Sequence, residues 1–114
     1  MSKIDEAAKA EAIRELNDAF RKSLIGGSVM LTPGVSDLEP KSLEQALNAV
    51  KSFDRFTTDN DPYSEHDFGS FDTAGQKLFF KIDYYDPSME FGSADPTDPS
   101  KTTRVLTLML AEEY

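Results

Sequence analysis

The sequence predicts a single α+β domain over residues 1–114, in which an antiparallel sheet of about four strands carries two helices packed on one face. Apolar residues recur at helical spacing in two segments, and they alternate or accompany β-branched residues in four shorter ones. The chain is also 39% apolar, which is enough for one buried core at this length. Residues 1–10 lack an apolar stripe, and we expect them to fray.

The first helix is predicted from apolar residues spaced three and four apart. These are Ile13, Leu16, Phe20 and Leu24. Charged residues, among them Arg14, Asp18 and Arg21, are assigned to the opposite, solvent-facing side. Gly26-Gly27 is expected to end the helix, because glycine adopts positive φ without steric cost. A short β-prone segment over residues 28–32 follows, and Pro33-Gly34 is expected to end it as a turn.

The second helix is predicted to begin at Pro40, which suits a first helical turn, or at Ser42, which forms a capping box with Gln45. Its apolar stripe consists of Leu43, Ala46, Leu47, Val50 and Phe53. The polar residues 57–65 that come after it are typical of a loop.

A hairpin is predicted from residues 67–71 and 77–85, joined by a loop of three to five residues within 72–76. Alternation divides the second strand between two faces. Leu78, Phe80, Ile82 and Tyr84 are assigned to the core, and Phe79, Lys81, Asp83 and Tyr85 to the other face. Residues 104–110 are interpreted as a last strand because of their β-branched neighbours, with a helix over Thr102 to Ala111 as the alternative.

Negative charge is concentrated in the middle of the chain. The whole sequence carries 21 acidic and 12 basic residues, a net charge of -9. Residues 54–98, which we call the acidic segment, contain 11 acidic and three basic residues and so account for a net charge of −8. This charge disfavours direct contact with nucleic acid or an anionic membrane, and it favours a basic protein partner.

The expected location is the cytoplasm. The start of the chain has no signal-peptide pattern, no apolar run approaches the roughly 20 residues of a membrane span, and there is no cysteine. No cofactor is expected, and no residue is assigned a catalytic role.

The residues expected to bind a partner are acidic, with one tyrosine among them. They are Asp59, Asp61, Glu65, Asp67, Asp83, Tyr85, Asp86 and Glu90. Aromatic residues near these acids (Phe79, Tyr84, Tyr85 and Phe91) would add cation–π contacts with arginine and lysine. The competing interpretation is that the rings belong to the core and the acids serve solubility.

A metal site is the alternative for part of the acidic segment. Asp59, Asp61, Glu65, His66 and Asp67 fall within nine residues, and carboxylates are the ligands that hard cations prefer. Against this, the spacing departs from an EF-hand loop, and these aspartates are also typical of side chains that cap local backbone groups. His66 is a candidate general base if a carboxylate from elsewhere orients it, or else a packed histidine. Lys81 and Asp83 are similarly either part of a nuclease-like set with Asp67 or an ion pair.

Four stretches resemble a known family. They are residues 16–20, residues 61–62 with 65–69, residues 81–86, and residues 103–107 with 109–114. Their sequences include Glu65-His66-Asp67-Phe68-Gly69 and Lys81-Ile82-Asp83-Tyr84-Tyr85-Asp86. Together they resemble domain of unknown function family 3768, an uncharacterised bacterial family of small acidic proteins, from about Ile13 to the C-terminus. The resemblance implies a gene carried on plasmids and integrated elements, near DNA-transfer and anti-restriction genes. It provides no site residue.

Two functional hypotheses follow from charge and resemblance together. The first is a mobile-element interaction protein that mimics DNA and occupies the basic, nucleic-acid-binding surface of a defence or DNA-processing protein. The second is a metal-binding protein, or a small metal-dependent enzyme, that uses Asp59 to Asp67.

Overall fold

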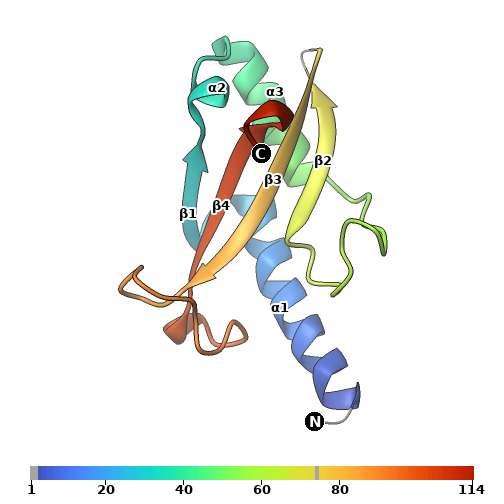
Figure 1. Cartoon of the computed structure of the whole chain (residues 1–114), viewed down its shortest axis with the longest axis vertical. Helices are drawn as coiled ribbons and strands as arrows, with labels where there is room; N and C mark the ends of the chain where they lie inside the picture. The colour runs from blue at the N-terminus through green and yellow to red at the C-terminus, as the bar shows by residue number, and fades with distance from the viewer. Residues whose placement is uncertain (1–2, 74) are drawn as a thin grey trace.

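The computed structural model describes residues 3–73 and 75–114 (Figure 1). Its main elements in chain order are α1 (Lys3–Ser23), β1 (Gly27–Leu31), α2 (Pro33–Ser36), α3 (Pro40–Ser52), β2 (Phe68–Thr73), β3 (Gln76–Tyr85) and β4 (Thr103–Leu110). Two short 3-10 helices, η1 (Pro99–Lys101) and η2 (Ala111–Glu113), flank β4. The α+β class predicted from the sequence is confirmed.

The sheet is mixed, so the prediction of a wholly antiparallel sheet is wrong. Its strand order is β1-β4-β3-β2; β2 and β4 both pair antiparallel with β3, whereas β1 pairs parallel with β4. The parallel register runs from Gly27 opposite Arg104 to Leu31 opposite Leu108. The apolar pattern of a strand determines which side chains are buried, but it is the same for either direction of the neighbouring strand. Direction was therefore not available from the pattern of residues 28–32.

Both long helices lie behind the sheet in Figure 1, and the face toward the viewer, which we call the open face, is left uncovered by them. The core between helices and sheet combines α1, α2 and α3 with the inward side chains of the strands. Its buried members are Phe20, Val35, Ala46, Val50, Phe53, Leu78, Phe80, Ile82, Leu106, Leu108 and Leu110. The assignment of Leu78, Phe80 and Ile82 to the core face is thereby confirmed.

The α1 helix begins at Lys3 and so extends through most of the segment expected to fray. Its buried residues include the predicted Ile13 and Phe20, but also Asn17 and Arg21, which are 0% and 2% exposed. Assigning Arg21 to the solvent side was therefore wrong, because α3 packs beside α1 and provides polar backbone groups for its side chain. No helix within residues 3–73 and 75–114 has both the length and the apolar character needed to cross a membrane.

The connection after α1 differs in detail from the prediction. The helix ends at Ser23, and Leu24 takes the left-handed conformation first, at φ 59°, followed by Gly26 at φ 107°. Pro33-Gly34 opens the one-turn helix α2 instead of a simple turn. Proline suits this first helical position, and the wholly buried Val35 anchors the turn in the core.

The hairpin and the last strand are present as predicted. The pairing of β2 with β3 continues to Thr73 opposite Gln76, so the connection is shorter than the three to five residues expected; Ala74 within it lies outside the described residues. Residues 103–110 form a strand and not a helix. Its length lets β4 pair with β1 on one side and β3 on the other.

Candidate interaction surface

Three aspartates are fixed in the loop between β3 and β4, which we call the Asp-Pro loop (residues 86–101). Each begins an Asp-Pro-Ser or Asp-Pro-Thr triplet, and its carboxylate accepts a hydrogen bond from the hydroxyl two residues later. The pairs are Asp86 with Ser88 at 2.7 Å, Asp95 with Thr97 at 2.5 Å and Asp98 with Ser100 at 2.7 Å. The triplets are visible in the sequence. The feature of the sequence that could have predicted these contacts is the serine or threonine that stands two residues after each aspartate.

These hydrogen bonds favour the ionised form of the three carboxylates. The serine or threonine hydroxyl, with backbone N–H groups, lowers the pKa of Asp86, Asp95 and Asp98 below its ordinary value. Hydroxyl and amide donors carry no net charge, so they orient a carboxylate without neutralising it. The loop therefore presents negative charges at defined positions.

The first part of the Asp-Pro loop is a tight turn over residues 86–91. The Asp86 N–H donates to the Phe91 carbonyl at 2.8 Å, and the Met89 N–H donates back to the Asp86 carbonyl at 3.0 Å. The Asp86 carboxylate also accepts from the N–H of Glu90 at 3.2 Å. At the base of the turn, an isolated bridge pairs Tyr85 with Gly92. Of the predicted partner-binding residues, Asp86 thus organises the turn while Glu90 is exposed on it.

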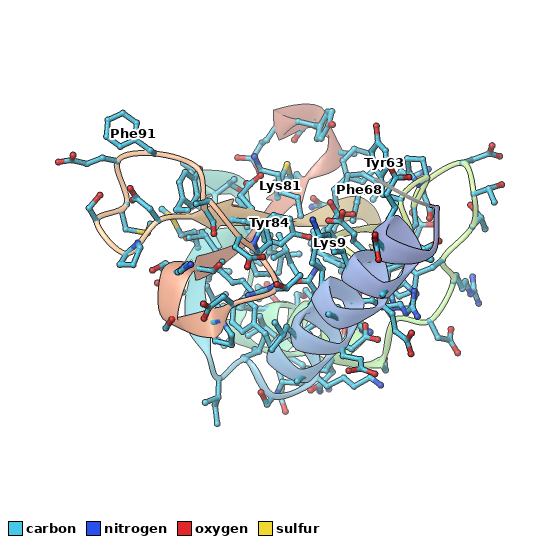
Figure 2. All side chains as sticks on the ribbon, turned by 90° about the horizontal axis from the view of Figure 1, so that it is seen from below. Lys9, Tyr63, Phe68, Lys81, Tyr84 and Phe91 are labelled. Carbon is cyan, nitrogen blue, oxygen red and sulfur yellow. The ribbon has the colours of Figure 1, made fainter. Side chains whose placement is uncertain are left out.

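The loop of residues 53–67 lies on the other side of α1 from the Asp-Pro loop (Figure 2). Here Asp61 is buried, and its carboxylate accepts from the backbone N–H groups of Glu65 and His66 at 3.0 and 3.1 Å. This confirms the local capping that the sequence offered as one interpretation of Asp61. Because the carboxylate is turned inward, Asp61 does not face a partner.

His66 joins this loop to α1. Its Nδ1 lies 3.0 Å from the Asp18 carboxylate, and its Nε2 lies 3.8 Å from that of Asp61. The imidazole also stacks on Phe56, with ring centroids 3.8 Å apart and planes at 4°. With both ring nitrogens facing carboxylates and one ring face covered, the histidine ties the loop to the helix. Asp18 is a carboxylate from elsewhere in the chain, as the general-base interpretation required, and the stacking on Phe56 agrees with the packing interpretation.

Glu65 belongs to a buried polar network that the sequence did not reveal. The Tyr84 hydroxyl donates to its carboxylate at 2.6 Å, and Asn17 donates to the Tyr84 hydroxyl at 2.8 Å. Arg104, only 4% exposed, donates from Nε to the Asn17 amide oxygen at 2.7 Å. Burial and the Glu65 contact raise the pKa of Tyr84, and burial lowers the pKa of Arg104. The network fastens α1 to β3 and β4, so Glu65 is structural here.

The predicted aromatic cluster is divided between separate places. Tyr84 points toward α1, whereas Phe79 lies on the open face, where its ring packs with Phe68 at 5.4 Å and Tyr114 at 5.3 Å. Tyr85 lies half-buried on the open face, and Phe91 is exposed in the turn. Alternation along β3 explains the division, since Tyr84 and Tyr85 are neighbours in sequence but point to opposite faces.

The open face also holds the ion pair of Lys81 and Asp83, whose side-chain atoms are 3.0 Å apart. Figure 2 shows Lys81 and Phe68 projecting from this face and Tyr84 from the opposite one. Both members of the pair are about 40% exposed, so it contributes well under ~1 kcal/mol. Lys81 and Asp83 therefore form the ion pair that was one of the two interpretations of these residues in the sequence.

The residues considered for a metal site do not form a set of ligands in the part of the chain that the structure describes. Within residues 3–73 and 75–114, no three His, Asp or Glu side chains gather where they could hold an ion. Asp59 is exposed, Asp61 caps the backbone, Glu65 faces Tyr84 and His66 faces Asp18. These side chains are close in the sequence but point toward different partners. The loop changes direction at two left-handed residues, Ser64 and His66, both at φ 57°.

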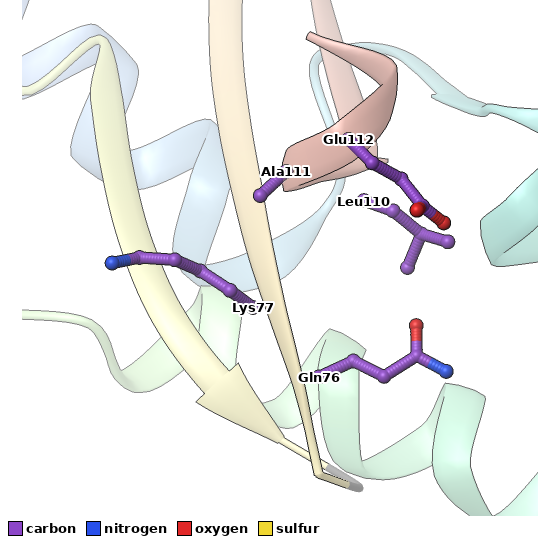
Figure 3. A pocket seen from close by; sticks show the side chains of 5 residues that line it. All are labelled: Gln76, Lys77, Leu110, Ala111 and Glu112. Carbon is purple, nitrogen blue, oxygen red and sulfur yellow. The ribbon is translucent and has the colours of Figure 1, made fainter.

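Two hollows of the described surface are lined by neither His66 nor Asp18. One of about 330 Å³ lies between the start of β3 and η2, where Gln76 and Glu112 point into the space and Lys77 points away (Figure 3). Another, of about 840 Å³, lies between α1 and residues 62–65 and is lined mainly by exposed side chains, Tyr63 among them. Neither shows a nucleophile paired with a base, which acyl or phosphoryl transfer would need.

The pKa of Asp67, at the end of the loop of residues 53–67, is raised above its ordinary value. Burial is the main cause, followed by the neighbouring carboxylate of Glu65 and, more weakly, those of Asp61 and Asp83. A raised pKa means that the ionised form is disfavoured in the folded protein, and this destabilises the fold at neutral pH.

Asp67→Asn should therefore raise the midpoint of chemical denaturation at pH 7. The destabilisation by the ionised Asp67 carboxylate is fully present above the pKa that Asp67 has in the folded protein, and it is absent below the ordinary value of 3.8. The variant and the unmodified protein should therefore have equal midpoints at about pH 3. Asp59→Asn, at an exposed position, is the matched control and should change neither midpoint. A lower midpoint for Asp67→Asn at pH 7 would show that the carboxylate stabilises the fold.

Comparison with known proteins agrees with the resemblance seen in the sequence. A sequence model described as "Protein of unknown function (DUF3768)" matches residues 31–113. The match begins later than Ile13, so the first of the four stretches lies outside it. No curated protein and no solved structure matches the chain. Because the match covers most of the sequence, the chain belongs to the DUF3768 family of proteins of unknown function.

Proposed function

We propose that this protein is an acidic interaction protein that binds a basic protein partner. In the setting that the resemblance implies, it is encoded on mobile elements and occupies the nucleic-acid-binding surface of a defence or DNA-processing protein, as a mimic of DNA. The observation that supports this is the set of fixed, ionised carboxylates in the Asp-Pro loop.

Fixed carboxylates suit this role better than mobile ones. A side chain already held in one conformation loses little entropy when it meets a lysine or an arginine. A surface of one charge sign also speeds encounter with a surface of the other sign. Asp54, Asp59 and Asp72 are exposed and extend the negative field beyond the loop, and Glu90 is exposed within it.

Removing charge from the Asp-Pro loop should slow association with a basic partner. The variant Glu90→Gln, Asp95→Asn, Asp98→Asn retains an accepting oxygen at each position, so the hydroxyl contacts that shape the loop can persist. We expect the on-rate at low salt to fall by about tenfold and its dependence on salt to flatten. Asp61 and Glu65 are poor targets, because they hold the structure together.

The test is capture of the partner from the host at low salt, followed by association kinetics with the purified partner across a salt series. A matched control removes three exposed carboxylates outside the acidic segment, with Glu11→Gln, Glu15→Gln, Glu44→Gln. An on-rate that is flat across salt, or one that falls equally in both variants, would rule out the acidic segment as the binding surface.

A further inference from the structure

We propose that the turn of residues 86–91 is the contact by which the protein recognises its partner, with Met89 and Phe91 as apolar anchors that meet apolar side chains bordered by arginine or lysine. This inference rests on the proposed function and adds to it the location and chemistry of the contact. The fitting partner is a protein segment that is both basic and apolar.

The first observation is the exposure of two large apolar side chains in one turn. Phe91 is 70% exposed and Met89 is 45% exposed. Figure 2 shows the Phe91 ring at the outer end of the Asp-Pro loop, pointing away from the rest of the molecule. Aromatic residues and methionine are enriched in the centres of protein interfaces.

The second observation is that the turn is held rigidly in this exposed form. The hydrogen bonds between Asp86 and Phe91 close it, and the Ser93 N–H anchors its base by donating to the Tyr84 carbonyl at 3.1 Å. Met89 adopts φ 62°, a left-handed conformation that is unusual for an unbranched apolar residue. Strain of this kind persists only where the surrounding contacts impose it. The anchors are thus presented in place, and little ordering cost remains to be met on binding.

The third observation is the charge around the anchors. Glu90 lies between them in the chain and is exposed, and the Asp86 carboxylate of the same turn accepts from the N–H groups of Glu90 at 3.2 Å and Phe91 at 3.4 Å. An apolar centre with a rim of one charge sign selects a partner with an apolar centre and a rim of the opposite sign. A purely hydrophobic partner would leave the carboxylates desolvated, and a purely basic one would leave Met89 and Phe91 in water.

The probe is a display library of random short peptides, selected against the full chain. We expect enriched peptides to combine arginine or lysine with leucine, phenylalanine or tryptophan, and their affinity to fall as salt rises. The test variant is Met89→Asn, Phe91→Ser, in which asparagine tolerates the left-handed conformation of position 89. The matched control is Tyr63→Ser, which removes a ring that is 74% exposed on the other loop. Unchanged denaturation midpoints verify that both variants are folded.

Three results are decisive. Affinity for the enriched basic peptides that falls by about tenfold or more in Met89→Asn, Phe91→Ser, with Tyr63→Ser unchanged, supports the turn as the contact. Salt-dependent binding of basic peptides that both variants retain overturns this inference but leaves the proposed function in place. Selection without enrichment of basic residues, or binding that is flat across salt, overturns the proposed function and this inference with it.

Discussion

Replacing Phe80 by alanine should lower the free energy of unfolding by about 3–5 kcal/mol, as deletion of a large buried ring does in other cores. Phe80 is fully buried in β3. Its ring packs edge-on against Phe53 at 5.3 Å and against Phe56 at 6.5 Å, and both of these lie at or just beyond the end of α3. The alanine variant would leave a cavity between the sheet and the end of that helix, where two other rings lose their contact.

The neighbouring residue provides the control. Lys81 lies on the open face, and Lys81→Ala removes only its exposed ion pair with Asp83, so it should cost less than ~1 kcal/mol. Urea denaturation of the two variants at one pH measures the difference directly. Equal losses would mean that the two faces of β3 contribute equally to the core.

Arg21→Ala should have an effect of similar size, about 3–5 kcal/mol, for a different reason. The Arg21 guanidinium donates from Nη1 to the carbonyls of Val50 and Phe53, both at 2.8 Å, and from Nη2 to the Asp18 carboxylate at 3.1 Å. These carbonyls lie at the C-terminal end of α3, where helical carbonyls lack a partner in the helix itself. Alanine would remove the guanidinium donor from the Phe53 carbonyl and would leave the Val50 carbonyl only its long backbone hydrogen bond from the Phe53 N–H, at 3.4 Å. It would also remove a favourable positive charge from the helix end.

Arg14→Ala is the matched control for this prediction. Arg14 lies two helical turns earlier on α1 and makes an exposed hydrogen bond to the Ser64 carbonyl at 3.0 Å. Its loss should cost less than ~1 kcal/mol. Denaturant melts that place the two arginine variants within experimental error of each other would contradict the capping role of Arg21.

Part of the candidate site was readable in the sequence. The Asp-Pro-Ser and Asp-Pro-Thr triplets form contacts between residues only two apart, so a local pattern is sufficient to predict them. The capping role of Asp61 was also available as one interpretation, because its partners are four and five residues away. The exposure of Met89 and Phe91 was not, since an apolar residue in a loop gives no sign of whether another element covers it.

By itself, the sequence determined the presence of the two long helices and of the four strands, and which face of β3 enters the core. It did so because the periods of 3.6 and 2 residues are local properties of the chain. Only the tertiary structure decided that β1 runs parallel to β4, and that Asn17, Arg21 and Arg104 are buried. The apolar pattern of a strand is the same whether the neighbouring strand runs parallel or antiparallel to it. A buried polar residue depends on partners that are 29 to 87 positions away in the chain, which no local pattern contains.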